Sequence, residues 1–200
     1  MNPFTSSREL ELALIASDIP VADWGQGIAK SVADLWLELQ NGETTLFFST
    51  EDGSILYRQT QVVELLIQRE DETLIEAMQE LGNGERRYRN RLPSEKIKAD
   101  ETPFLAARRC LHEEFSLAEV QLEAIQITIE QPVVQPVDLV GEKLHSSPSY
   151  PGLNTLYTVH RARIVGCDFP AHDFATENRA HAEGDPVKAH HWHWAKEWAK

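Results

Sequence analysis

A short segment rich in charged side chains carries the clearest chemical signal in this chain. Glu101 is followed eight positions later by Arg109, and Glu113 and Glu114 come about one helical turn after that arginine. Carboxylate oxygens are the ligands that hard divalent cations prefer. An arginine four positions before a glutamate can pair with it on a helix and fix its orientation. The pattern predicts a divalent-metal site, and the alternative is an ordinary helix with an acidic, solvated face.

The charged residues belong to a predicted helix that begins after residue 101. Thr102 is a favourable N-cap, and Pro103 suits the first helical position. At about 100° per residue, the apolar side and the charged side of this helix separate. The apolar side holds Phe104, Ala107, Leu111 and Phe115, and an opposite arc of roughly 140° holds Arg109, Cys110, Glu113 and Glu114. We expect the first set to pack on the core and the second set to face the site.

The segment resembles the signature of the Nudix superfamily. That signature reads glycine, five residues, glutamate, seven residues, Arg-Glu-apolar, one residue, Glu-Glu, one residue and Gly-apolar. The matching positions are Glu101, Arg109, Leu111, Glu113, Glu114 and Leu117, and residues 92–97 resemble the usual Leu-Pro-Gly-Gly-Lys-Val lead-in. The resemblance implies a Nudix-like α/β/α sandwich with a mixed sheet. It also implies a hydrolase that cleaves a nucleoside diphosphate linked to another group.

The same resemblance assigns roles to the matching residues. Glu101, Arg109, Glu113 and Glu114 are the catalytic candidates, and Glu113 and Glu114 are the candidate ligands of Mg²⁺ or Mn²⁺. A bound ion of this kind would neutralise charge on phosphoryl oxygens and lower the pKa of an attacking water. Arg109 is expected to brace the glutamates by ion pairing.

The chain departs from the signature at four positions. Ser94 and Glu95 replace the two glycines of the lead-in, Cys110 replaces the glutamate after the arginine, and Ser116 replaces the closing glycine. A thiol is a softer ligand than a carboxylate and suits Mg²⁺ poorly. The departures leave a second interpretation open, in which the chain is a catalytically inactive Nudix-like binding or regulatory module.

The most basic stretch of the chain is residues 85–91, which lie shortly before the lead-in. Arg87, Arg89 and Arg91 are candidate substrate-binding residues, because a guanidinium can donate two hydrogen bonds to phosphate oxygens. Alternatively, this stretch is a solubilising segment that pairs with nearby acids. The first reading predicts a small phosphorylated partner, and the resemblance implies a nucleotide derivative.

Two further segments, residues 189–195 and 142–154, contain residues that are typical of metal sites or of substrate-binding sites. Along a strand, alternation would separate His190 from His191 and His193. We therefore expect residues 189–195 to form a packed aromatic edge with buried tryptophans rather than a metal site. The loop over residues 142–154 contains His145 and Tyr150, which are either substrate contacts or parts of a plain surface loop.

Composition limits the classes of function. The chain has 200 residues, 42% of them hydrophobic, and a net charge of −13. This charge argues against broad binding to nucleic acid or to an anionic membrane. No apolar run approaches the ~20 residues of a membrane span, and the first residues lack the layout of a secretory signal. With two cysteines and no disulfide framework, we expect a cytoplasmic protein; its oligomeric state is not indicated.

The remaining patterns predict a mixed α/β fold. Helical spacing covers residues 28–39, and a hairpin is expected from residues 45–48 and 55–57 around a turn at 51–54. Further strands are predicted at 62–68, 74–81, 125–129 and 156–165, although residues 76–78 favour a helix. We expect residues 1–60 to form an N-terminal extension or added subdomain, and residues 61–200 to form the Nudix-like domain.

Overall fold

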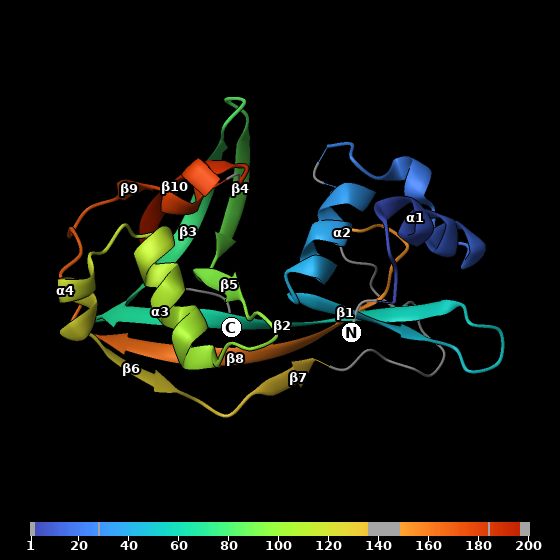
Figure 1. Ribbon diagram of the computed structural model, residues 1–200. Helices are drawn as coiled ribbons and strands as arrows, with labels where there is room; N and C mark the ends of the chain where they lie inside the picture. Colours follow the sequence, from blue (N-terminus) through green and yellow to red (C-terminus); the bar gives the residue numbers. More distant parts are fainter. Residues whose placement is uncertain (1–2, 28, 136–148, 184, 197–200) are drawn as a thin grey trace. The chain divides into compact units, whose positions relative to one another are not determined.

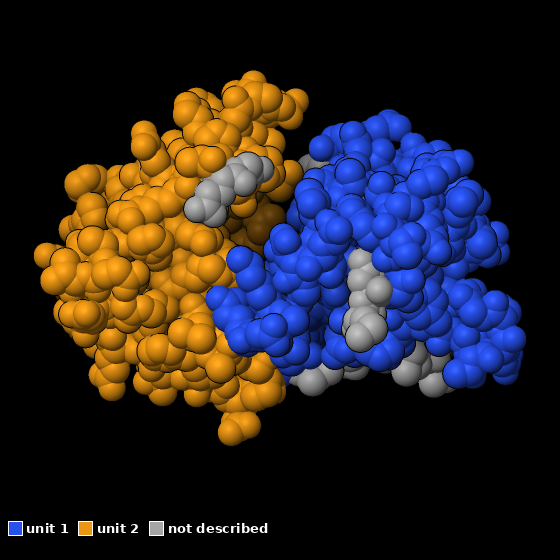
Figure 2. Space-filling model, viewed as in Figure 1, with its two compact units in different colours: residues 1–62, 96–101, 133–159 blue, residues 63–95, 102–132, 160–200 orange. Residues whose placement is uncertain are grey.

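The computed structural model describes residues 3–27, 29–135, 149–183 and 185–196 (Figure 1). The chain divides into two compact units (Figure 2). The first comprises residues 1–62, 96–101 and 133–159, and the second comprises residues 63–95, 102–132 and 160–200. Residues 1–60 thus belong to one unit together with two later segments. The division into an N-terminal part and a Nudix-like domain stays a prediction.

The first unit packs its helices around one apolar cluster. Its helices are α1 (Ser7–Ala16), the 3-10 helix η1 (Val21–Asp23) and α2 (Val32–Gln40). Helix α2 begins where the Ser31 hydroxyl accepts the Asp34 N–H and the Asp34 side chain accepts in return, which is a capping box. The cluster is formed by Leu10, Leu14, Ile19, Trp24, Leu35, Leu39, Leu46, Ile55, Tyr150 and Leu153. The helix predicted over residues 28–39 is confirmed for residues 32–39, where it follows the Ser31 cap, and residue 28 lies outside the described residues.

Strands of the first unit pair antiparallel. β1 (Thr44–Phe48) pairs with the first residues of β2 (Ile55–Arg69), with Thr44 opposite Thr60. The predicted hairpin is confirmed, and Gly53 in its turn has a φ of +72°, a conformation that glycine adopts without strain. β7 (Val133–Gln135) pairs with the start of β8 (Thr155–Val165).

The second unit is built on strands that pair through β3 (Glu72–Leu81). β3 pairs antiparallel with the end of β2, with β4 (Arg86–Arg91) and with β10 (Val187–Ala195). β10 also pairs with β9 (Phe174–Glu177), and β6 (Gln126–Ile129) pairs with the end of β8. The short β5 (Ser94–Lys96) lies beside β2. Pairing with β4 and β10 overrides the helical preference of residues 76–78 and confirms the strand.

Helix α3 (Pro103–Glu113) begins as predicted, because the Thr102 hydroxyl accepts the Leu105 N–H at 3.2 Å. It contacts β6, α4 (Glu119–Glu123) and η2 (Arg179–Glu183). The predicted orientation of this helix is wrong at two positions, since Phe104 is 43% exposed and Cys110 is fully buried. The helix packs instead through a stripe formed by Ala106, Ala107, Cys110 and Leu111.

Strands with helices beside them confirm the mixed α/β class, and the arrangement is consistent with the expected α/β/α sandwich. Among the described residues, no helix combines the length and the apolar composition that a bilayer span requires.

Candidate metal centre

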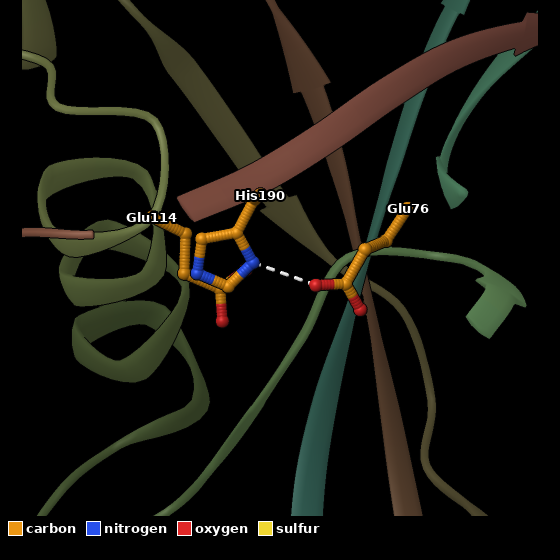
Figure 3. Close-up of side chains that lie close together, drawn as sticks. All are labelled: Glu76, Glu114 and His190. Carbon is orange, nitrogen blue, oxygen red and sulfur yellow. Dashed lines mark hydrogen bonds and ion pairs between the residues drawn. The ribbon is translucent and has the colours of Figure 1, made fainter. Parts of the chain in front are cut away.

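Three side chains from separate elements of the second unit meet in one cluster (Figure 3). Glu76 comes from β3, Glu114 follows α3, and His190 comes from β10. One ligand atom of each lies within 4.8 Å of the others. Nδ1 of His190 is 2.6 Å from Oε1 of Glu76 and 3.9 Å from Oε2 of Glu114. Two carboxylates and an imidazole form a donor set that suits a divalent transition metal.

Strand alternation directs His190 into this cluster. Along β10, His190, Trp192 and Trp194 are buried, whereas His191 and His193 lie on the other face. The predicted separation of the histidines and the buried tryptophans are both confirmed. The His190 ring stacks on Trp192 with 5.4 Å between centroids, and Trp192 stacks on Phe115 at 4.1 Å. The aromatic contacts hold the imidazole plane in place.

Strand β9 fixes the backbone at the end of α3. The Thr176 hydroxyl donates to the Glu114 carbonyl oxygen and accepts from Trp192 Nε1 at 2.7 Å. Ser116, which has a φ of +55°, donates its hydroxyl to the Glu177 carbonyl oxygen at 2.7 Å. Its position in the left-handed region agrees with the glycine of the Nudix signature, since glycine adopts that region without strain. The backbone that carries Glu114 is therefore held by hydrogen bonds on both sides.

The two carboxylates of the cluster differ in their affinity for protons. Burial, reinforced by the charges of Glu76 and Glu95, raises the pKa of Glu114 well above its usual value. Burial also acts against ionisation of Glu76, but the hydrogen bond and charge of His190 outweigh it and lower the pKa of Glu76. Glu76 therefore binds a proton less readily than Glu114 does.

The residues present fit a bound metal ion. His190 Nε2 is buried and has no hydrogen-bond partner among the described residues. A buried polar atom without a partner costs free energy, and a bound metal ion would remove that cost. The cluster thus offers a ring nitrogen of His190 beside the buried Glu76 and the half-buried Glu114.

Of the four residues predicted to be catalytic, Glu114 is the one in this cluster. Arg109 pairs with Glu113 at 3.4 Å and with Glu95 at 3.2 Å, so it braces a glutamate as expected. Glu113 is not part of the cluster of ligand atoms within 4.8 Å. Glu101 belongs to the first unit, and its Oε2 accepts the Lys98 N–H at 3.1 Å.

The predicted phosphate-binding arginines lie on β4. Arg89 Nε is 3.2 Å from Oε2 of Glu76, which connects this strand directly to the cluster. In the β3–β4 ladder, Arg87 lies opposite Gln79 and Arg91 lies opposite Glu76. Binding of substrate by the three arginines stays a prediction, and for Arg89 the structure adds a contact with a candidate ligand.

Two residues that replace signature residues adjoin the site. Cys110 forms a hydrogen bond with Glu114, and burial together with the charges of Glu114 and Glu95 raises the pKa of its thiol well above the usual value. The thiol therefore stays protonated and donates to Glu114. Glu95 stands where the signature has glycine, and its carboxylate pairs with Arg109. The carboxylates of Glu95 and Glu76 lie close enough to act electrostatically on this thiol.

The loop predicted over residues 142–154 is described only in part, and His145 lies outside the described residues. Tyr150 is fully buried in the first unit, where its hydroxyl donates to Glu38 at 2.9 Å. For Tyr150, the expectations of a surface position and of a substrate contact are therefore wrong, because the ring is part of the apolar cluster.

Comparison with known proteins gives a distant structural likeness. No family model and no curated protein matches the chain. The crystal structure of a NUDIX hydrolase from Nitrosomonas europaea matches with 18% sequence identity and a TM-score of 0.31, over 64% of this chain and 66% of that chain. The chain thus spans slightly less than two thirds of that structure. A likeness this distant assigns no chemistry to the chain.

Proposed function

We propose that this protein is a divalent-metal-dependent hydrolase of a phosphorylated small molecule, with a nucleoside diphosphate linked to another group as its substrate class. The observation that carries the proposal is the buried cluster of Glu76, Glu114 and His190. The Nudix-like spacing around Glu114 supplies the expected reaction.

Glu76, Glu114 and His190 are the residues that would hold the ion. When bound, a divalent ion supplies charge neutralisation at phosphoryl oxygens and lowers the pKa of an attacking water. An imidazole ligand suits a transition metal better than it suits Mg²⁺, which prefers oxygen. We therefore expect Mn²⁺ to support the reaction better than Mg²⁺.

The surrounding side chains keep the ligands in position. Arg89 pairs with Glu76 and Cys110 donates to Glu114, so each carboxylate has a neighbour that orients it. Trp192 stacks on His190 and is itself stacked on Phe115, which holds the imidazole ring in place. Arg87 and Arg91 are proposed to bind substrate phosphates from β4.

A screen of products tests this function. Purified protein would be incubated with nucleoside diphosphate derivatives and Mn²⁺ or Mg²⁺, and the products identified by mass spectrometry. We expect two phosphorylated fragments from at least one substrate, and no product from the Glu114→Gln variant. A broad panel that yields no product with either metal would overturn the hydrolase proposal.

Binding without hydrolysis is a second candidate function. It is supported by Cys110, because its protonated thiol replaces the glutamate that the signature has at this position. Cys110→Glu distinguishes the two candidates. If the unmodified protein binds nucleotides calorimetrically but hydrolyses them only after this substitution, the binding module is the better description.

A further inference from the structure

A buried glutamine borders on the candidate metal centre and has no role in the proposed function. Gln79 lies on β3, three positions after Glu76, and it is 7% exposed. In the sheet it lies opposite His190 of β10 on one side and opposite Arg87 of β4 on the other. Gln79 thus lies between the strand that carries a proposed ligand and the strand that carries the proposed phosphate-binding arginines.

The amide of Gln79 is oriented by Glu76. Its Nε2 donates to Glu76 Oε1 at 2.8 Å, and His190 Nδ1 lies 2.6 Å from the same oxygen. A half-turn of the amide would place its carbonyl oxygen against this carboxylate oxygen, so that two acceptors would face each other. The nitrogen therefore faces Glu76, and the carbonyl oxygen of Gln79 is left for another partner.

The carbonyl oxygen of Gln79 is buried and has no hydrogen-bond partner in the part of the chain that the structure describes. Four buried side-chain atoms are in this state among those residues, and two of them are Gln79 Oε1 and His190 Nε2. Both belong to side chains that contact Glu76 Oε1. A carboxylate beside Nδ1 favours the imidazole tautomer with its proton on Nδ1, so Nε2 carries a lone pair, as the carbonyl oxygen does. One cation could therefore satisfy both atoms.

The carbonyl oxygen lies within reach of such an ion. The oxygen and nitrogen of an amide are about 2.2 Å apart, so Gln79 Oε1 lies at most about 5 Å from Glu76 Oε1. The ligand atoms of Glu76, Glu114 and His190 lie within 4.8 Å of one another. The last torsion of a glutamine side chain is broad, so the amide can adjust its direction without a change in the strand.

An amide oxygen also has the chemistry that this site needs. Side-chain carbonyl oxygens are regular ligands of hard divalent cations. Because an amide is neutral, it adds an oxygen to the two carboxylates and the imidazole without adding negative charge. The site would therefore gain a ligand without repelling a phosphate more strongly.

We propose that the carbonyl oxygen of Gln79 is a fourth protein ligand of the ion that Glu76, Glu114 and His190 hold. The inference rests on the proposed metal-dependent function. The alternative is a positioning role, in which Gln79 acts only through the N–H that orients Glu76. The two roles differ in the water bound to the ion, because water replaces a lost protein ligand but not a lost orienting bond.

Pulsed electron paramagnetic resonance of Mn²⁺ in heavy water tests the assignment, because it measures the water molecules bound to the ion. Gln79→Met removes the amide with little change in volume, and a thioether is a soft ligand that suits Mn²⁺ poorly. Gln79→Glu keeps an oxygen but not the N–H. The matched control is Gln68→Met on β2, because Gln68 is exposed and donates to Thr73 outside the cluster. Circular dichroism checks the fold of each variant.

In Gln79→Met we expect one more water on the ion than in the unmodified protein, and an affinity for Mn²⁺ that is about tenfold lower. Gln79→Glu should return the number of waters to that of the unmodified protein, and Gln68→Met should match the unmodified protein in both measurements. The inference is overturned if the ion carries equal numbers of waters in the unmodified protein and in Gln79→Met. That result would leave the metal centre intact, whereas an unmodified protein that binds no Mn²⁺ would overturn the proposed function together with this inference.

If Gln79→Met does not fold, a measurement on the unmodified protein decides. Cell-free synthesis would supply glutamine labelled with ¹³C at the side-chain carbonyl and leave glutamate unlabelled. Electron–nuclear double resonance should then detect a strong coupling between this carbon and the bound Mn²⁺, because the carbonyl oxygen joins the two directly. Bound Mn²⁺ without such a coupling would overturn the assignment of Gln79.

Discussion

His190 and Glu76 lie on neighbouring strands, and the imidazole Nδ1 is 2.6 Å from the carboxylate Oε1 although 114 positions separate them in the chain. The contact is buried, and the other ring nitrogen has no partner among the described residues. This pair therefore supplies a rigid nitrogen donor at the proposed metal centre.

The first prediction concerns that nitrogen donor. His190→Gln should weaken Mn²⁺ binding by about 100-fold, because loss of a ligand costs at least as much as loss of a residue that orients one. The matched control is His193→Gln on the exposed face of the same strand, where His193 pairs with Asp173 at 2.8 Å. Isothermal titration would measure both affinities. Equal effects of the two substitutions would contradict the assignment of His190.

The second prediction concerns Thr176, which positions Glu114 through its backbone. Thr176→Val removes the hydroxyl that joins Trp192 to the Glu114 carbonyl oxygen. Metal affinity should fall by about 10-fold, in the range found for groups that orient ligands. Thr176→Ser keeps the hydroxyl and should restore the affinity. If serine fails as valine does, the effect would come from packing and not from the hydrogen bond.

The third prediction concerns backbone strain at Ser116. Its φ of +55° disfavours a side chain, but its hydroxyl bond to Glu177 offsets part of that cost. Ser116→Ala keeps the strain and loses the bond, so we expect it to lower the free energy of unfolding by about 1 kcal/mol. Ser116→Gly loses the bond but also the strain, and should be at least as stable as the alanine variant in urea unfolding. A glycine variant less stable than the alanine variant would refute this reasoning.

The fourth prediction is a pH dependence of stability. Burial acts against ionisation of Glu38, but Lys96, Lys30 and Arg58 outweigh it and lower its pKa from 4.5 to about 2. Because the folded pKa is the lower one, the stabilisation is complete above about pH 4.5 and is lost as the pH falls towards 2. The contribution lost is roughly 3 kcal/mol.

Urea unfolding between pH 2 and 7 would measure this contribution. Glu38→Gln should be less stable than the unmodified protein at pH 7, because it leaves three cations without their carboxylate. The difference between the two proteins should shrink as the pH falls below 4.5. A difference that stays constant across this range would show that Glu38 does not titrate as described.

Local patterns in the sequence predict much of the fold. The Thr102 cap, the hairpin around Gly53 and the alternation along residues 189–195 all depend on neighbouring residues, and the structure confirms each of them. The orientation of α3 was predicted less well. Which side of a helix is buried depends on its partners, and here α3 buries Cys110 and leaves Phe104 half exposed.

The metal cluster could be predicted only in part. Glu114 stands out through its spacing, whereas Glu76 lies in a segment whose composition favours a helix. Alternation separates His190 from the other histidines, which argues against a metal site made of histidines, and that same alternation directs it towards Glu76. Bringing these three residues together requires the pairing of β3 with β10, which no short-range pattern determines.

The central claim is that Glu114 binds a divalent metal together with Glu76 and His190, and a comparison of two adjacent glutamates tests it most directly. Electron paramagnetic resonance would count Mn²⁺ bound by the unmodified protein, by Glu114→Gln and by Glu113→Gln, whose side chain pairs with Arg109 outside the cluster. The account predicts one bound ion in the unmodified protein, retention of that ion in Glu113→Gln and its loss in Glu114→Gln. An unmodified protein that binds no Mn²⁺, or a Glu114→Gln variant that binds it undiminished, would contradict the account.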